Sequence, residues 1–359
     1  MAVAFVSSFA HLAVEGNELF AGNERLKAVI ASWEDRAARI NALDFTWSGE
    51  ESQKGRVDSS PLKKASTARP DVAFGYKTRL ILDHKSRVLL DYEGKRWSPE
   101  KADYVESRTV TAFNGTVRID YFPSGEKFPS AHITQQDKAL KAGRHVRALP
   151  LRMAFRATDA NLGVFDPKKL ATSHLKGQVG AVRCDILKHG ADEIWVDPAR
   201  DYIPMRWYEK RGGVTLWFID IDYIFDKRHG WIPSEWKIVS LTDAGQIIDS
   251  IPGLVTEYTI NAPVADACFQ IDFRPGTWVQ NYITNERYIQ RESGAKRVIP
   301  DGEYDGTNYE TILRTDSPGQ WSVSWLRIGG GLLAIVVISA LLRLWRRVSG
   351  KSAQKLPTA

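Results

Sequence analysis

The sequence predicts a mainly antiparallel β domain with some helix, in which an open half-barrel wraps around an N-terminal amphipathic helix. Runs of alternating apolar and polar residues recur about every ten residues, with turn-forming residues between them, and this spacing is typical of an antiparallel meander. Before these runs, one stretch has apolar residues at the spacing of an amphipathic helix. A large twisted sheet is expected to curl around this helix. An apolar run near the C-terminus adds one predicted transmembrane helix.

The first predicted element is a helix over Glu24–Ile40, with Asn23 as its N-cap. Its apolar residues recur at spacings of three and four and form one stripe: Leu26, Val29, Ile30, Trp33, Ala37 and Ile40. The period then changes to two at Leu43, Phe45 and Trp47, which indicates a strand with one buried face. The polar, proline-containing stretch 52–71 is predicted to be a mobile loop.

A first series of strands follows this loop. The predicted strands are Lys77–Leu82, Arg87–Tyr92, Arg108–Phe113 and Thr116–Tyr121. Asn114-Gly115 joins the last two and is a strong hairpin signal. Glu93-Gly94 is expected to turn the chain toward Trp97.

Residues 122–180 show weaker patterns and are expected to form an insert or cap. Gln135–Arg156 has the composition of a helix, but Pro150 falls within it. Because proline interrupts a helix interior, one or two short helices are expected here.

A second, clearer series follows, with turn residues at each joint. Its predicted strands are Ala181–Lys188, Asp192–Asp197, Tyr202–Lys210, Val214–Asp226, Trp231–Leu241 and Leu254–Ile260. Asp266–Phe273 is a further predicted strand, which ends at Arg274-Pro275-Gly276. The ordered domain is thus expected to span residues 23–280, and the less periodic residues 281–325 are predicted to be a juxtamembrane linker.

The predicted membrane anchor, residues 326–345, is centred on the apolar run from Ile328 to Leu342, which lies between Arg327 and Arg343. As a helix, the run from Ile328 to Leu342 would be roughly 22 Å long, which is short of a ~30 Å hydrocarbon core. Snorkelling of Arg343 and the interfacial Trp345 can supply the difference. The alternatives are a buried core helix or a re-entrant segment.

Charge predicts the orientation of this anchor. Five basic residues and no acidic one follow Leu342, so the positive-inside rule places the tail, residues 346–359, in the cytoplasm and the bulk of the chain outside it. Without these five cations the chain has 44 basic and 43 acidic residues, which argues against a nucleic-acid-binding surface. Residues 1–22 are expected to be an export signal. They lack the basic residues with which such signals begin, so the signal is either weak or truncated at its start. The alternative is a tail-anchored protein with a cytosolic domain.

The sequence offers no recognisable active site, metal site or cofactor motif. The seven histidines are not spaced as metal ligands. Cys184 and Cys268 are expected to be free buried thiols, with a disulfide as the alternative. Asp220 and Asp222 share one face of a predicted strand, where a solvated face is favoured over acid/base chemistry. An enzymatic reading would have to assemble distant residues such as these two and His229, so the chain is predicted not to be an enzyme.

Aromatic residues are abundant, with nine of the twelve tryptophans within residues 23–280. They either fill the concave side of a curved sheet or line a cavity for an acyl chain or apolar peptide. The residue pattern leaves both alternatives open.

Three features of the chain resemble the bacterial LolA/LolB-like outer-membrane lipoprotein-sorting family. They are the helix followed at once by a Phe-containing strand (Glu24–Trp47), the run Tyr92-Glu93-Gly94-Lys95-Arg96-Trp97, and a W-x-D-P turn leading to a Pro-containing strand (Ile194–Arg206). The resemblance implies an unclosed antiparallel barrel capped by helices, whose apolar interior holds lipoprotein acyl chains; related domains act as periplasmic stress sensors. The chain departs from the family in its predicted tether and in having no cysteine before Cys184 to carry a lipid.

We therefore expect a tethered domain on the periplasmic side that binds a lipid, lipoprotein acyl chain or hydrophobic peptide. The alternative is a structural or signalling envelope module that binds another protein and no small molecule. The expected cavity wall consists of aromatic residues: Trp33, Phe45, Trp47, Trp97, Trp195, Trp207 and Trp217.

Overall fold

The computed structural model describes residues 23–55, 69–83, 85, 87–125, 128–135, 145–303 and 308–314. The chain divides into two units, Met1–Val298 and Ile299–Ala359. In the second unit, the short helix α3 (Tyr309–Arg314) buries Tyr309 and Ile312. The sheet, the helices that cover it and the candidate site described below belong to the first unit.

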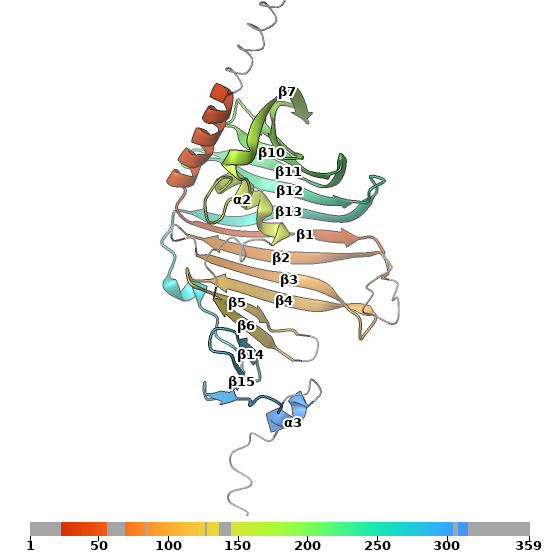
Figure 1. Ribbon diagram of the computed structural model, residues 1–359, viewed down its shortest axis with the longest axis vertical. Coiled ribbons are helices and arrows are strands. Elements are labelled where there is room, and N and C mark those ends of the chain that lie inside the picture. Colours follow the sequence, from red (N-terminus) through yellow and green to blue (C-terminus); the bar gives the residue numbers. More distant parts are fainter. Residues whose placement is uncertain are drawn as a thin grey trace, which may run out of the picture. The chain divides into compact units, whose positions relative to one another are not determined.

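The first unit is built on one sheet of sixteen strands (Figure 1). The first series is β1 (Leu43–Gln53), β2 (Val72–Leu82), β3 (Val88–Ser98), β4 (Asp103–Phe113), β5 (Val117–Phe122) and β6 (Ser130–Gln135). The second series is β7 (Leu170–Val179), β8 (Val182–His189), β9 (Asp192–Asp197), β10 (Ile203–Arg211), β11 (Val214–Asp226), β12 (Gly230–Leu241) and β13 (Ile247–Ile260). The last strands are β14 (Trp278–Asn281), β15 (Glu286–Gln290) and β16 (Lys296–Val298).

Two antiparallel meanders, β1–β6 and β7–β13, join where β1 pairs with β13. The chain then crosses back along the sheet, and β14 pairs parallel with β6. Within the described residues the edge strands β7 and β16 do not pair with each other, so the sheet stays open. The prediction of a mainly antiparallel, unclosed sheet is confirmed.

A helix over residues 23–39 packs on one face of the sheet, as predicted (Figure 1). We call this face the covered face and the opposite one the open face. Val29, Trp33 and Ile40 on the helix stripe are buried in the main apolar cluster. The Trp33 indole N–H donates to the carbonyl of Tyr202 (2.7 Å), and the Ser32 hydroxyl donates to that of Asp201 (2.7 Å). These carbonyls lie in the turn after β9, so the Asp-Pro turn serves to dock the helix.

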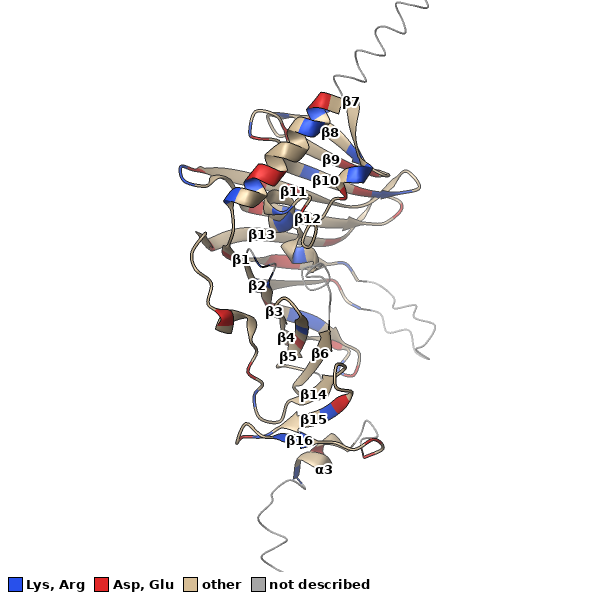
Figure 2. Ribbon diagram, turned by 60° about the vertical axis from the view of Figure 1, so that its left-hand side comes forward, with Lys and Arg blue, Asp and Glu red and all other residues tan. Residues whose placement is uncertain are grey.

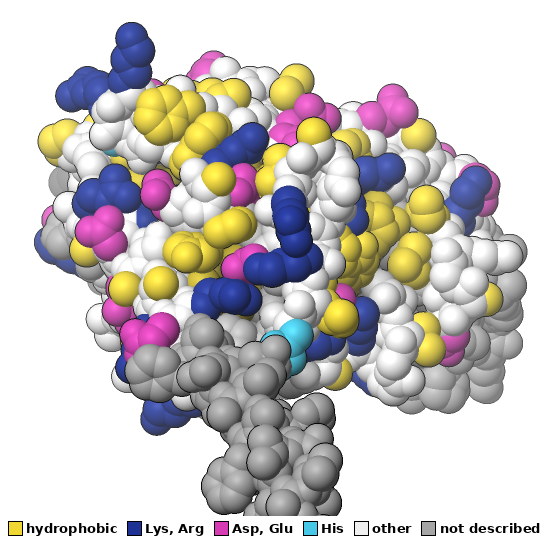
Figure 3. All heavy atoms as spheres, turned by 90° about the horizontal axis from the view of Figure 1, so that it is seen from above, with side chains coloured by type: hydrophobic (Ala, Val, Ile, Leu, Met, Phe, Trp, Pro, Cys, Tyr) yellow, Lys and Arg dark blue, Asp and Glu magenta, His cyan; other side chains and the backbone are white. Residues whose placement is uncertain are grey.

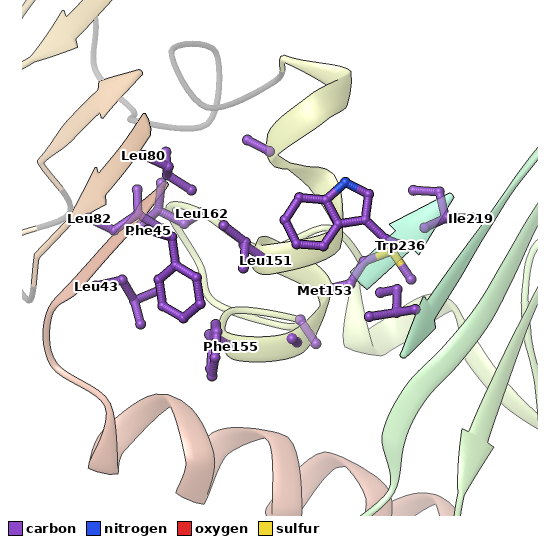
Figure 4. Close-up of a cluster of buried hydrophobic side chains, with 14 of the residues drawn as sticks. Leu43, Phe45, Leu80, Leu82, Leu151, Met153, Phe155, Leu162, Ile219 and Trp236 are labelled. Atoms are coloured by element: carbon purple, nitrogen blue, oxygen red, sulfur yellow. The ribbon is translucent and has the colours of Figure 1, made fainter. Parts of the chain in front are cut away.

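A second segment, the cap segment (residues 145–169), lies over the middle of the covered face. It contains η2 (Val146–Ala148), α2 (Leu149–Phe155) and η3 (Pro167–Lys169). Leu151, Met153 and Phe155 of α2 are buried (Figure 4). The sheet therefore does not wrap around the N-terminal helix alone, because α2 packs against β10 and β12. Pro150 lies in the first turn of α2, where its missing N–H costs no hydrogen bond, so it begins the helix and does not interrupt it.

Two buried arginines tie the cap segment to its surroundings. Arg156 donates to the carbonyls of Phe155 (2.8 Å) and Ile40 (2.6 Å), so it binds beside the C-terminal end of the N-terminal helix. Burial lowers the pKa of Arg156. Arg152 donates to the carbonyls of Leu162 (2.8 Å) and Gly163 (3.1 Å), which closes the loop after α2.

Several boundary predictions are wrong. Glu93-Gly94 is not a turn, because β3 continues to Ser98. Gly94 is needed for close packing, since a Cβ there would stand 2.3 Å from the Tyr92 hydroxyl oxygen. Strands β6 and β7 lie inside the predicted insert, because tertiary pairing outweighs their weak local patterns.

Two further predictions fail after β13. Asp266–Phe269 forms a short 3-10 turn (η4) in place of a strand, and Arg87 holds it by an ion pair with Asp266 (2.5 Å) and a ring contact with Phe269 (4.4 Å). The sheet does not end near residue 280, because β15 and β16 extend it into the predicted juxtamembrane linker.

The predicted signal (1–22), most of the predicted loop (56–68) and the predicted anchor and tail fall outside the described residues. The anchor residues concerned are Arg327, Ile328, Leu342, Arg343 and Trp345. In the part of the chain that the structure describes, no helix has both the length and the apolar character needed to span a membrane.

Candidate functional site

The covered face is lined by aromatic side chains that the sequence singled out. Trp33, Phe45, Trp47 and Trp207 are buried in the main cluster, and Trp217 packs against it. The rings meet in pairs, with centroid distances of 5.3 Å for Trp47 and Trp236 and 4.7 Å for Trp207 and Trp217. Strand alternation places these residues together, because every second residue faces the same side.

Two of the seven predicted wall residues lie elsewhere. Trp195 stands between Ile194 and Val196, which face the covered side, so its own ring turns to the open face. There it packs over Gly177, where a Cβ would stand 2.5 Å from the ring, and against Tyr208 (5.6 Å). Trp97 lies near the end of β3, outside the main cluster, with Tyr104 at 5.3 Å.

The cap segment fills the space between these aromatic residues. Phe155 packs on Phe45 (5.7 Å) and Phe165 on Trp33 (5.9 Å) and Trp207 (5.3 Å). Figure 4 shows Leu151, Met153 and Phe155 of α2 among Phe45, Leu80 and Trp236 of the sheet. The cap segment therefore occupies space that a ligand on this face would need.

The open face offers a hollow of a different kind. A space of about 410 Å³ lies over β13, β1, β2 and β3. Its walls are mostly charged or polar: Asp44, Thr46, Lys77, Arg79, Asp91, Glu93, Glu257, Tyr258 and Thr259. Some of these charges pair across strands, as Arg79 does with Asp44 (2.7 Å), and Figure 2 shows residues of both signs interspersed along the strands. Such walls do not suit an acyl chain.

A buried polar cluster, not predicted from the sequence, lies under the cap segment. Arg147 from η2 forms an ion pair with Glu51 of β1, whose side chain is 3% exposed. The Arg147 guanidinium lies over the rings of Tyr92 (4.2 Å) and Tyr76 (5.5 Å). Burial raises the pKa of Tyr76, and it raises that of Tyr92 to about 12. The only sequence signal was the position of Glu51, in phase with Phe45 and Trp47 on β1.

Several polar atoms of this face are buried without a hydrogen-bond partner. They include the indole N–H groups of Trp207 and Trp236, the Thr78 hydroxyl and Nδ1 of His145. A buried donor without an acceptor costs about 1–3 kcal/mol. Their presence on one covered face calls for a partner such as water or the oxygen atoms of a ligand.

His145 should make stability depend on pH. Burial, and next the charge of Arg147, lowers its pKa to about 3. The unfolded chain therefore binds a proton near pH 6.5 that the folded chain does not, so stability falls as pH drops below about 6.5. Between pH 7.5 and 5 the loss from this residue is about 2 kcal/mol.

Urea unfolding of the full chain at both pH values checks this. His145→Asn should abolish about that much of the pH dependence, and His174→Asn, at an exposed position, should leave it intact. Equal pH dependence in the wild type and His145→Asn would contradict the expectation.

The other candidates from the sequence have structural roles. Asp220 accepts from Arg206 across β10 and β11 (2.6 Å for Nη2 and Oδ2), while Asp222 is exposed, which fits a solvated strand face. Cys184 and Cys268 are both free, but only Cys184 is buried as predicted, whereas Cys268 is half-buried. Burial raises the pKa of Cys184 to about 11. Among the described residues, no three His, Cys, Asp or Glu side chains gather as metal ligands would.

No protein-family model matches the sequence. No curated protein matches it significantly. Similar solved structures include a DUF1329 family protein from Desulfovibrio piger, with TM-score 0.34 and 8% identity over 70% of this chain and 97% of that one. Another is a LolA superfamily protein from Nitrosomonas europaea, with TM-score 0.37 and 9% identity over 68% and 98%. Likenesses this distant decide neither family nor function, so the resemblance to the LolA/LolB-like family stays a prediction.

Proposed function

We propose that this chain is a non-enzymatic, membrane-anchored envelope domain that binds an acyl chain of a lipid or lipoprotein, or an apolar peptide, on the covered face. In this proposal the C-terminal anchor holds the domain on the periplasmic side, with the basic tail in the cytoplasm. The cap segment is a cover that moves aside, and the aromatic residues beneath it form the binding surface.

The observation that carries the proposal is the pairing of a large aromatic surface with buried donors that lack acceptors. An ester or carboxyl group places acceptor oxygens at the end of an apolar chain. Such a ligand would bury its chain against Phe45 and Trp47, and its oxygens could accept from Trp236 or Thr78.

Photocrosslinking in membranes tests this. Cells that express the full chain are given a fatty acid with a photoactivatable diazirine group, and crosslinked peptides are mapped after illumination. We expect labels on β1, β12 and α2, and excess unlabelled oleic acid should compete for them. Labels confined to residues 326–345 would leave the anchor as the only lipid contact and would overturn acyl binding on the covered face.

One observation favours the alternative, a structural or signalling module that binds another protein. The cap segment already fills the covered face with its own side chains, so no ligand is needed to complete the core. Crosslinking with a protein-reactive reagent in the same membranes separates the two functions. A stoichiometric protein partner together with an unlabelled covered face would favour the module.

A further inference from the structure

Three turns lie at the same end of the second meander. In an antiparallel meander successive turns alternate between the two ends, so the turns β7–β8, β9–β10 and β11–β12 share one end. The turns β10–β11 and β12–β13 lie at the opposite end. The shared end combines exposed apolar residues with unpaired cations.

The apolar part is the tip of the β11–β12 hairpin. Ile224 and Phe225 are consecutive, and 46% and 62% of their surfaces are exposed. The tip is held rigidly, because the Asp226 carboxylate accepts from the backbone N–H groups of Arg228 (2.8 Å) and His229 (2.9 Å). Phe225 also leans on Trp231, with ring centroids 5.1 Å apart. The exposed ring is thus fixed in place by the fold.

The basic part surrounds this tip. Lys227 and Arg228 are exposed, and their side chains form no hydrogen bond or ion pair with the described residues. Arg200, from the β9–β10 turn, lies over the Trp231 ring at 4.6 Å. The half-buried Arg200 and the exposed Arg183 both line a hollow of about 630 Å³.

Three acidic residues of this region are already engaged, whereas Asp201 and Asp222 are exposed and form no ion pair with the described residues. Asp185 pairs with Lys176, Asp197 pairs with Arg200 (3.2 Å), and Asp226 holds the hairpin turn. Viewed from the β7 side, the surface shows apolar side chains with Lys and Arg as well as Asp and Glu between them (Figure 3). Unpaired cations beside protruding apolar side chains match a layer of anionic headgroups over hydrocarbon.

We infer that this hairpin-end surface, made of Ile224, Phe225, Arg183, Lys227 and Arg228, docks on an anionic lipid surface. Phe225 and Ile224 enter the boundary between headgroups and acyl chains, and the cations contact lipid phosphates. One aromatic ring and a few cations bind weakly, which suffices for a chain that is already at a membrane. The inference does not require acyl binding on the covered face.

A depth-sensitive probe tests the docking. Phe225→Cys in a Cys268→Ser background carries the fluorophore NBD; Cys184 is buried and its raised pKa keeps it unreactive. The full chain is reconstituted with phosphatidylcholine vesicles, with or without phosphatidylglycerol, that contain a doxyl-lipid quencher. The matched control carries the probe at Val214, an exposed residue at the opposite end of β11.

We expect strong quenching at position 225 in vesicles with phosphatidylglycerol and little at position 214. Each cation near an anionic surface contributes roughly fivefold, so Lys227→Gln with Arg228→Gln should lower the ratio of quenched to unquenched probe about 25-fold. Arg211→Gln, in the opposite hairpin, should change it less than about twofold. Equal quenching at both positions, or none at 225, would overturn the inference. So would a lipid-free dimer that shields position 225.

Discussion

Arg147→Met is expected to lower the free energy of unfolding by about 3–5 kcal/mol, because it leaves a buried carboxylate without its partner. Glu51 is 2% exposed, and Arg147 is its ion-pair partner. The substitution also removes the contact between the guanidinium and the Tyr92 ring. Urea unfolding of the full chain, followed by tryptophan fluorescence, measures the loss.

The control for this prediction is an exposed ion pair. Lys54 and Asp71 lie 2.9 Å apart, with 66% and 65% of their side chains exposed. Lys54→Met should therefore cost less than about 1 kcal/mol. Adding Glu51→Gln to Arg147→Met should restore part of the stability, because the uncompensated charge is gone. If Arg147→Met lowers the free energy of unfolding no more than Lys54→Met does, the ion pair of Arg147 and Glu51 does not hold the cap segment.

Phe155→Ala is expected to cost about 3–5 kcal/mol, since it removes a fully buried ring from the cap segment. Phe155 is 1% exposed and packs on Phe45. Its effect also tests whether the cap segment is a separable cover. If it is, amide hydrogen exchange should rise across residues 145–169 while the strands of the sheet stay protected.

Phe225→Ala provides the matched control, because the same ring is removed from a site that is 62% exposed. We expect a loss below about 1 kcal/mol and no change of exchange in the cap segment. Uniform exchange across the cap segment and the sheet in Phe155→Ala would show that they open as one unit. In that case the cap segment is part of the core, and the acyl-binding proposal loses its entry route.

Local pattern was enough to place many elements of this chain. The bounds of β9 and β11 are those predicted from alternation and turn residues. The Asn114-Gly115 hairpin forms as expected, with the Asn114 side chain accepting from Thr116 (3.1 Å) and Val117 (3.0 Å) and Gly115 at φ +104°. These features depend on residues close in sequence, so the sequence specifies them directly.

The grouping of aromatic residues was only partly predictable. Phe45 and Trp47 follow from alternation within one strand, but Trp195 faces the open side. Its neighbours Ile194 and Val196 are also apolar, so the pattern could not say which set turns inward.

The sequence by itself determined the mainly antiparallel β class, the first helix, most strands of the second meander and the positions of the aromatic residues. Only the tertiary structure decided that β1 pairs with β13, that β14 joins β6 in parallel, and that the cap segment covers the aromatic face. It alone brought Arg147 to Glu51. These contacts join residues from about forty to more than two hundred positions apart, and no local periodicity records them. They are selected by burial and charge pairing once the whole sheet has formed.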